Sequence, residues 1–171
     1  MAIESESASR HNNICISEAK QWIEFNVEQK IIKSIPWSEF ETESMKIIGV
    51  GNFGSVFKAI WSSTHSHVAC KKLNFQDKAW EAFKHELHMQ IRAHSCENVI
   101  RILGISNITD LSDEYVIVME YADGGNLKNF LLSKFEDLDW NQKFQLALGI
   151  TNGLYYLHKN DILHRDLVSV F

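Results

Sequence analysis

The sequence predicts an α+β fold in which a small sheet forms first and helices dominate the remainder. Three observations lead to this prediction. Short runs rich in β-branched and aromatic residues follow one another between Met45 and Leu73, separated by glycine or by Ser/His turns. A helical pattern and two further strand-like runs come next, and from Leu127 onward apolar residues recur at helical spacing.

The first 36 residues divide into two segments that differ in composition. Residues 1–16 are polar, rich in Ser and Glu and without periodicity, so we expect a disordered tail. Ser17 is a candidate N-cap, and the apolar residues after it recur at helical spacing: Ala19, Trp22, Ile23, Val27, Ile31 and Ile35. This pattern predicts an amphipathic helical extension over residues 17–36 that ends at Pro36. Packing of its apolar stripe on the following domain is favoured over binding of a partner.

The elements after Trp37 are expected in a fixed order. They are strands over 45–49, 55–61 and 67–73, a helix over 78–93, strands over 98–105 and 115–121, and helices over 127–135 and 140–159. The helix over 78–93 carries one apolar face, formed by Ala79, Phe83, Leu87 and Ile91. The last helix carries a largely apolar stripe that is expected to pack against another part of the fold. Its residues are Phe144, Ala147, Leu148, Thr151, Leu154, Tyr155 and His158.

Composition and charge exclude several classes of function. The 171 residues suit one domain with a short extension. The formal net charge is −5 and the basic residues do not cluster, so no nucleic-acid partner is expected. No 18-residue apolar window exists, and the N-terminus lacks the basic and apolar regions of a signal peptide. We therefore expect a cytoplasmic protein without membrane contact.

The three cysteines predict neither a disulfide framework nor a zinc site. Cys15, Cys70 and Cys96 are odd in number and lack the C-x-x-C spacing of such sites. We interpret them as thiols in a reducing compartment.

The stretch "GVGNFG" places Gly49, Gly51 and Gly54 in a G-x-G-x-x-G pattern. Glycines suit a loop whose backbone N–H groups approach phosphates closely, because a Cβ would intrude. A dinucleotide-binding fold needs a helix to start within this pattern, whereas residues 55–60 are typical of a strand. The context therefore favours a strand-loop-strand flap over a nucleotide, and an ordinary hairpin turn remains the alternative.

Two charged residues beyond this loop could act together. Lys71 lies on a predicted strand, from which its ammonium could reach phosphates under the flap. Glu86 lies on the next predicted helix and could pair with it. Each residue alone would be interpreted as ordinary surface charge, and the order of the surrounding motifs favours the pair.

Five stretches together resemble the protein kinase family, in its tyrosine-kinase-like and Ser/Thr-type branch. They are "IGVGNFGSVFKAIW", "VACKKL", "HELHMQIRAHSCENVIRILGI", "YVIVMEYADGGNLKNFL" and "GITNGLYYLHKNDILHRDL". The resemblance runs from about residue 43 to residue 167. It implies a protein kinase-like fold with a complete small lobe, one regulatory helix and the hinge over residues 37–121. Residues 122–171 would form a partial large lobe that contains its first helices.

The resemblance implies ATP as the bound nucleotide. Val50 and Val56 would cover the adenine, Met119 would be the gatekeeper, and the backbone of Glu120 and Ala122 would hydrogen-bond the adenine. The ATP-binding positions implied in this way are Gly49, Val50, Gly51, Gly54, Val56, Ala69, Lys71, Met119, Glu120 and Ala122.

The resemblance also implies catalytic residues. Lys71 would contact the α- and β-phosphates while it pairs with Glu86. Asp166 would orient the substrate hydroxyl and accept its proton, and His164 and Arg165 would support the loop around it. The implied reaction is phosphoryl transfer from ATP to Ser or Thr of a protein substrate, with Tyr as an alternative acceptor.

The family pattern H-R-D-L-x-x-x-N departs from this sequence at its end. Phe171 stands where the pattern has Asn, and the Asp-Phe-Gly segment is absent. In the family these segments hold Mg²⁺, which is therefore the expected metal. Its usual ligands are missing from this sequence, and no metal-binding residue is assigned. Because these ligands neutralise phosphate charge, we expect a truncated and inactive chain.

Two alternatives to an active enzyme remain open. The chain could be a non-catalytic, pseudokinase-like module that binds nucleotide or a partner protein, or it could be an incomplete gene product. In either case the apolar stripe of the last helix would be exposed and could recruit a chaperone.

Overall fold

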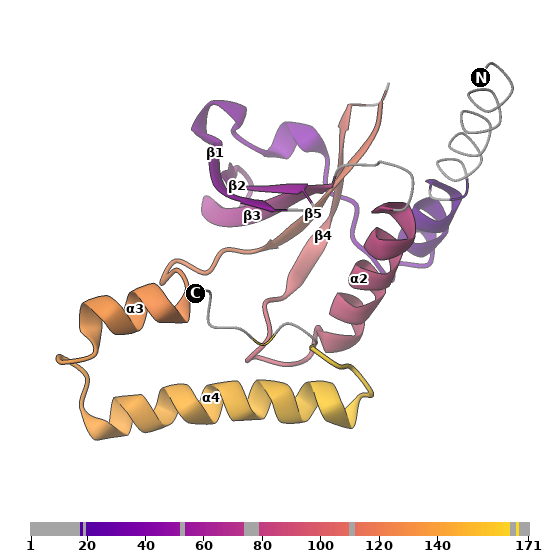
Figure 1. Cartoon of the computed structure of the whole chain (residues 1–171). Coiled ribbons are helices and arrows are strands. Elements are labelled where there is room, and N and C mark those ends of the chain that lie inside the picture. The colour runs from indigo at the N-terminus through magenta and orange to yellow at the C-terminus, as the bar shows by residue number, and fades with distance from the viewer. Residues whose placement is uncertain are drawn as a thin grey trace, which may run out of the picture. The chain divides into compact units, whose positions relative to one another are not determined.

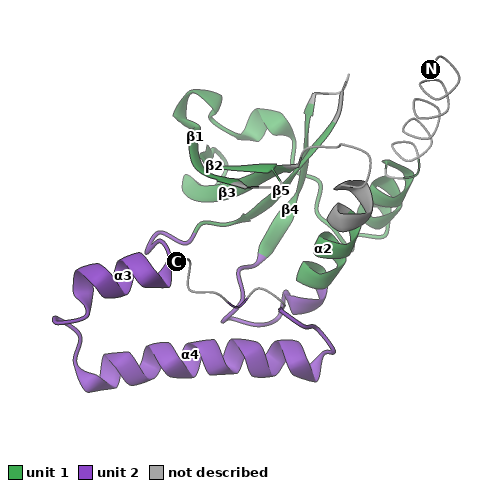
Figure 2. Cartoon of the chain, viewed as in Figure 1, with its two compact units in different colours: residues 1–91, 102–121 green, residues 92–101, 122–171 purple. Residues whose placement is uncertain are grey.

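The computed structural model describes residues 18, 20–51, 54–73, 79–109, 112–164 and 167. The chain divides into two compact units, one of residues 1–91 and 102–121 and the other of residues 92–101 and 122–171 (Figures 1 and 2). The first unit contains a sheet, and the second contains the helices α3 and α4.

Five antiparallel strands form the sheet in the spatial order β1-β2-β3-β5-β4 (Figure 1). The strands are β1 (Lys46–Gly51), β2 (Gly54–Trp61), β3 (Ser66–Leu73), β4 (Ile102–Thr109) and β5 (Ser112–Glu120). A helix over residues 20–28 precedes the sheet, and the later helices are α2 (Ala79–Ala93), α3 (Leu127–Lys134) and α4 (Trp140–Lys159). Two 3-10 turns, η1 (Trp37–Glu39) and η2 (Thr42–Ser44), lie before β1. The predicted α+β fold is thus confirmed.

Strand β3 distributes its side chains between the two faces of the sheet, because successive residues of a strand point to opposite sides. Val68 and Cys70 are buried in one apolar cluster, which also contains Ile35, Phe40, Ala59, Trp61, Val116 and Val118. Ala69 belongs to a second cluster, which also contains Ile23, Ile32, Leu87, Ile102, Ile105, Tyr115, Ile117 and Met119. Each set of alternating residues therefore has its own core.

The helix predicted over residues 17–36 is shorter than expected. The N-terminal helix (residues 20–28) ends in a turn at residues 29–30, where Lys30 has a φ of 57°. The N–H groups of Ile31 and Ile32 both donate to the carbonyl of Asn26 and so close the helix end. The apolar periodicity beyond this point has another cause: Ile32 and Ile35 are buried in the core without being helical, and Ile31 is exposed.

The segment after the N-terminal helix adds to the free edge of β4. Ser34 forms a parallel bridge with Ile105. The N–H of Ile35 donates to the carbonyl of Ile105, and the N–H of Ile105 donates to the carbonyl of Lys33, each at 2.9 Å. The backbones lie so close that a Cβ at Gly104 would collide with the carbonyl of Lys33. The extension is thus part of the first unit, as its predicted packing on the following domain requires.

The predicted strand over 98–105 also begins too early. Val99 donates its N–H to the carbonyl of Cys96, and residues 94–99 form turns. β4 therefore starts at Ile102 and extends to Thr109, because its partner is β5 along that whole length.

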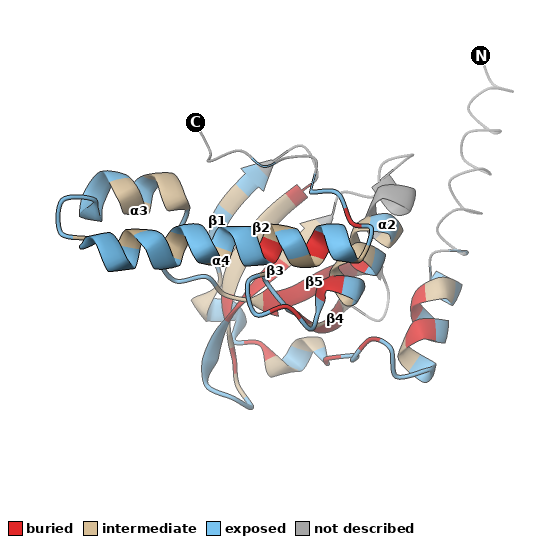
Figure 3. Cartoon of the chain, turned by 90° about the horizontal axis from the view of Figure 1, so that it is seen from below, coloured by how far each residue is buried: buried red, intermediate tan, exposed pale blue. Residues whose placement is uncertain are grey.

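Local capping explains the bounds of the helices in the second unit. Asn126 caps α3 by accepting from the N–H of Asn129 at 2.8 Å. Asp139 and Gln142 form a reciprocal capping box at the start of α4. The apolar stripe predicted on α4 is largely exposed, and Figure 3 shows most of this helix in the colour of exposed residues. Gly153 and Leu157 are the buried residues of α4.

The described cysteines are buried thiols. Cys70 and Cys96 form no disulfide, and Cys15 lies outside the described residues. Burial raises the pKa of the Cys70 thiol to about 12. Within the part of the chain that the structure describes, no helix is long and apolar enough to span a membrane.

Gly104→Ala should destabilise the chain, because the added methyl meets backbone rather than a flexible side chain. We expect a loss of about 1–3 kcal/mol in the free energy of unfolding, the usual cost of overpacking. Gly124→Ala is the control, since a Cβ there meets nothing within 4 Å. Equal stability of the two variants in chemical denaturation would contradict the close approach of residues 33–35 to β4.

Hydrogen bonds around Glu39 hold the segment that directly follows the extension against the end of β2. The Trp61 indole and the Ser63 hydroxyl both donate to Glu39 Oε2, at 2.6 and 2.7 Å. These hydrogen bonds, that from Ser63 foremost, and the nearby charge of Lys33 lower the pKa of Glu39 below its ordinary value of 4.5. The Lys33 ammonium also lies 4.8 Å from the centroid of the Trp61 ring.

The lowered pKa makes stability depend on pH. The folded state binds the Glu39 proton less tightly than the unfolded state, so the carboxylate stabilises the fold above about pH 4.5 and loses this effect as the pH falls through the folded pKa. Glu39→Gln should therefore melt below the wild type near neutral pH, and the difference should shrink in acid. A difference in melting temperature that is the same at all pH values would exclude a contribution from the charge.

Candidate functional site

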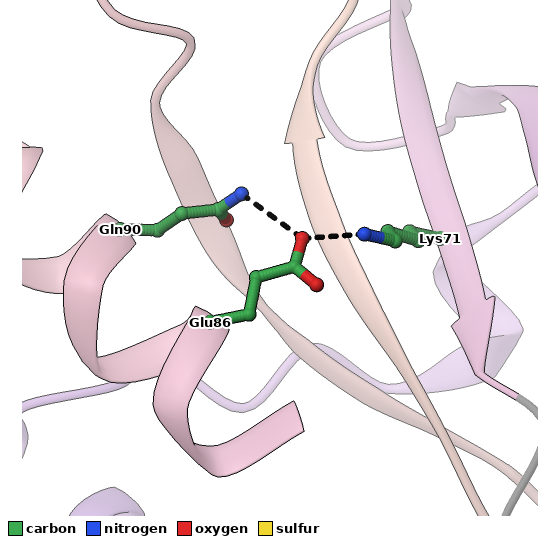
Figure 4. Close-up of polar contacts among 3 residues, drawn as sticks. All are labelled: Lys71, Glu86 and Gln90. Carbon is green, nitrogen blue, oxygen red and sulfur yellow. Dashed lines mark hydrogen bonds and ion pairs between the residues drawn. The ribbon is translucent and has the colours of Figure 1, made fainter. Parts of the chain in front are cut away.

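Lys71 and Glu86 form an ion pair between β3 and α2 (Figure 4). The distance from Lys71 Nζ to Glu86 Oε1 is 2.5 Å, and the side chains are 19% and 31% exposed. The structure thus brings together the two charged residues that the sequence analysis paired. Both side chains keep part of their surface exposed.

The register of the sheet places more of the predicted residues around Lys71. Lys71 lies opposite Val56 on β2, and Ala69 lies opposite Met119 on β5. Residues directly opposite each other in antiparallel strands share a face, and so do alternate residues of one strand. Val56, Ala69, Lys71 and Met119 therefore lie on one face of the sheet, where Ala69 and Met119 are buried and Val56 packs against their cluster.

The glycine-rich stretch forms a hairpin rather than the start of a helix. β1 ends at Gly51, which lies opposite Gly54 at the start of β2. Gly54 has a φ of 130°, which L side chains rarely adopt, so glycine is required at that position. The expected strand-loop-strand arrangement is present, and residues 52–53 at its tip lie outside the described residues.

Val50 does not join the other predicted residues. It lies opposite Ser55, whereas Gly49 lies opposite Val56, so Val50 and Val56 are on different faces of the sheet. The Val50 side chain is 79% exposed. The expected cover over an adenine from both valines is therefore not present in this arrangement, because the two-residue period of a strand separates them.

The remaining predicted residues lie after β5. Glu120 ends β5 opposite Val68, and Ala122 is exposed and accepts a hydrogen bond at its carbonyl from the N–H of Gly125 at 3.4 Å. His164 is exposed. Arg165, Asp166 and Phe171 lie outside the described residues. Among the residues that are described, no group of three or more His, Cys, Asp or Glu side chains could hold a metal ion.

Gln90 is a site residue that the sequence analysis missed. Its Nε2 donates to Glu86 Oε1 at 3.5 Å, so it contacts the same oxygen as Lys71 (Figure 4). Its Oε1 is buried and has no hydrogen-bond partner among the described atoms. The available signal was its position four residues after Glu86, which places both side chains on one face of a helix.

Comparison with known proteins agrees with this geometry. The sequence model of the family described as protein tyrosine and serine/threonine kinase matches residues 42–170. The chain belongs to this kinase family. The region of resemblance expected from the motifs coincides closely with that match, and the strands and helices correspond to a kinase small lobe followed by the first helices of the large lobe.

Individual relatives are similar along most of the chain. L-type lectin-domain containing receptor kinase IV.3 of Arabidopsis thaliana is 27% identical over 156 residues, which cover 88% of this chain and 23% of the relative. A Dictyostelium discoideum protein named "Probable serine/threonine-protein kinase" is 29% identical over 164 residues, or 96% of this chain and 25% of the relative. Cysteine-rich receptor-like protein kinase 1 of Arabidopsis thaliana is 36% identical over 131 residues, which cover 73% of this chain and 20% of the relative. The chain thus spans a quarter or less of these relatives.

A double-mutant cycle with Lys71→Met and Glu86→Gln should show that this pair is coupled in the free energy of unfolding. Residues in direct contact couple by roughly 0.5–3 kcal/mol. The matched pair is Lys72–Glu114, at 3.0 Å but with side chains 34% and 44% exposed. We expect its coupling to be smaller, about 0.2–1 kcal/mol, because solvent screens it. A larger coupling energy for Lys72–Glu114 than for Lys71–Glu86 would contradict this expectation, because the more exposed pair should be the weaker one.

Proposed function

We propose that this chain is the ATP-binding part of a protein kinase that transfers a phosphoryl group to Ser or Thr of protein substrates. The observation that carries the proposal is the Lys71–Glu86 ion pair, which joins β3 to α2 on the face where Val56, Ala69 and Met119 lie. Membership in a family whose description covers both tyrosine and serine/threonine kinases leaves Tyr as an alternative acceptor.

The residues present fit the triphosphate of ATP. Lys71 offers a cation whose position is fixed by a carboxylate, and its side chain keeps part of its surface accessible. Gly49, Gly51 and Gly54 give the hairpin of β1 and β2 three positions without a Cβ, and Gly54 starts the strand on which Val56 lies opposite Lys71. ATP would supply the phosphoryl group, while Lys71 would hold the α- and β-phosphate oxygens and Glu86 would keep the Lys71 ammonium in place.

The later steps of the reaction are proposed on the motif alone. Asp166 would orient the substrate hydroxyl and take its proton, and His164 and Arg165 would support the loop that carries it. Mg²⁺ would neutralise phosphate charge as in the family, and no residue of this chain is assigned to hold it. A cytoplasmic location and a protein substrate belong to the same proposal.

A second candidate is a non-catalytic module that binds nucleotide or a partner protein. The position of Phe171 where the family pattern has Asn favours it, because that Asn would contribute to metal binding. The exposed apolar residues of α4, among them Trp140, Phe144 and Tyr155, are consistent with an interaction surface. Magnesium dependence separates the two candidates.

ATP should raise the melting temperature of the purified chain, and Lys71→Met should remove most of this shift. A hydrogen bond to a charged group contributes about 1.5–3 kcal/mol, so the variant should bind ATP about 10- to 100-fold more weakly. Lys72→Met is the matched control, because Lys72 is the next residue of β3 and points to the other face, where it pairs with Glu114.

The pattern of results distinguishes the candidates. A magnesium-dependent shift with transfer of phosphate to a general protein substrate supports the kinase, whereas a magnesium-independent shift without transfer supports the non-catalytic module. If Lys71→Met and Lys72→Met lose the same ATP affinity, or if ATP does not raise the melting temperature of the wild type, ATP binding through the Lys71–Glu86 pair is excluded.

A further inference from the structure

The N-terminal helix shares an apolar cluster with the helix that carries Glu86. Ile23 of this helix and Ile32 just beyond it are 2% and 3% exposed. Both belong to the cluster that contains Leu87 of α2, which is fully buried and follows Glu86 directly. The N-terminal helix lies alongside α2 in two views at right angles (Figures 1 and 3).

The N-terminal helix is connected to the sheet by hydrogen bonds that do not involve α2. Its last turn is closed by Asn26, which is buried, donates from Nδ2 to the Trp22 carbonyl at 2.7 Å and accepts from Ile31 and Ile32. Immediately beyond, residues 33–35 pair with β4, which is one edge of the sheet. The helix is therefore tied to the sheet through backbone hydrogen bonds and can serve as a fixed support.

Helix α2 depends on side-chain packing for its position, because helices pack on a sheet through side chains rather than backbone hydrogen bonds. The described side chains through which it joins this cluster are Leu87 and the partly buried Ile91. Leu87 meets a cluster that the sheet and the N-terminal segment build jointly. Removing Ile23 or Ile32 would leave a void in this cluster, and packed neighbours relax toward such a void.

We infer that the N-terminal helix is a positioning element for the Lys71–Glu86 pair. Ile23 and Ile32 hold α2 at the depth at which the Glu86 carboxylate reaches Lys71, so loss of their packing lowers the affinity for nucleotide through Glu86. Ile23 and Ile32 are positioning residues, because their apolar side chains act only through packing. The nucleotide readout of this inference rests on the proposed function.

A double-mutant cycle in ATP affinity tests the inference. Ile23→Ala, Glu86→Gln and the double variant are compared with the wild-type chain by calorimetric titration with ATP, well below the melting temperature of each variant. Ile23→Ala should weaken ATP binding by about 5- to 10-fold, at the lower end of usual couplings between sites. In the Glu86→Gln background the same change should have no further effect, because the group through which Ile23 acts is gone.

Phe25→Ala is the matched control, since Phe25 is on the same helix and is 56% exposed. It should leave ATP affinity unchanged. If Ile23→Ala does not fold, Ile23→Val makes a smaller void and is interpreted in the same way. Unchanged affinity in the Ile23 variant, or an equal loss with and without Glu86, would overturn the inference, because the helix would then stabilise the fold without positioning the pair.

Hydrogen exchange of the α2 amides without nucleotide separates this inference from the proposed function. Ile23→Ala should accelerate exchange in α2 relative to Phe25→Ala, because α2 loses its support. If the wild type binds no ATP, the proposed function fails, and exchange alone decides the positioning role. Exchange in α2 that is identical in both variants would overturn it.

Discussion

The two-residue side-chain period of strand β3 is the constraint on which the first unit depends. Val68 and Cys70 enter one apolar cluster, whereas Ala69 and Lys71 face the other side. A shift of one residue in the register would bury the Lys71 ammonium in a core that contains Trp61 and Val118. The buried cores on both faces therefore specify on which face of β3 the Lys71 ammonium can lie.

The Lys71–Glu86 ion pair follows from this register and does not create it. Partly exposed ion pairs contribute little to stability, whereas removal of one partner leaves the other without a counter-charge. The apolar clusters supply most of the folding free energy, since burial of side chains such as Ile117 and Leu87 contributes about 1.5–3 kcal/mol each. The pair instead makes a geometric link between β3 and α2, and the proposed contact of Lys71 with phosphates depends on this link.

The folded first unit begins before residue 37, because the N-terminal segment contributes residues to both of its cores. Residues 33–35 protect the free edge of β4, and an unprotected edge strand is open to pairing with other chains. Gly104 lies within this pairing, in close contact with Lys33 and Ile35, and the hydrogen bond from Trp61 to Glu39 follows it along the chain. A unit cut at residue 37 would lose Ile23, Ile32 and Ile35 from its cores.

The sequence by itself determined the α+β class, the order of the elements and the kinase motifs, because strand period, helix period and capping are local. The bounds of α4, with the capping box at Asp139, agree with the periodicity at both ends. Tertiary structure decided the features that depend on distant residues. These include the end of the helix at residue 28 and the separation of Val50 from Val56, which follows from the register of β1 on β2. The partners of Leu87 likewise depend on the docked position of α2, since no local pattern states which elements meet, whereas the Gln90–Glu86 contact is local to the helix.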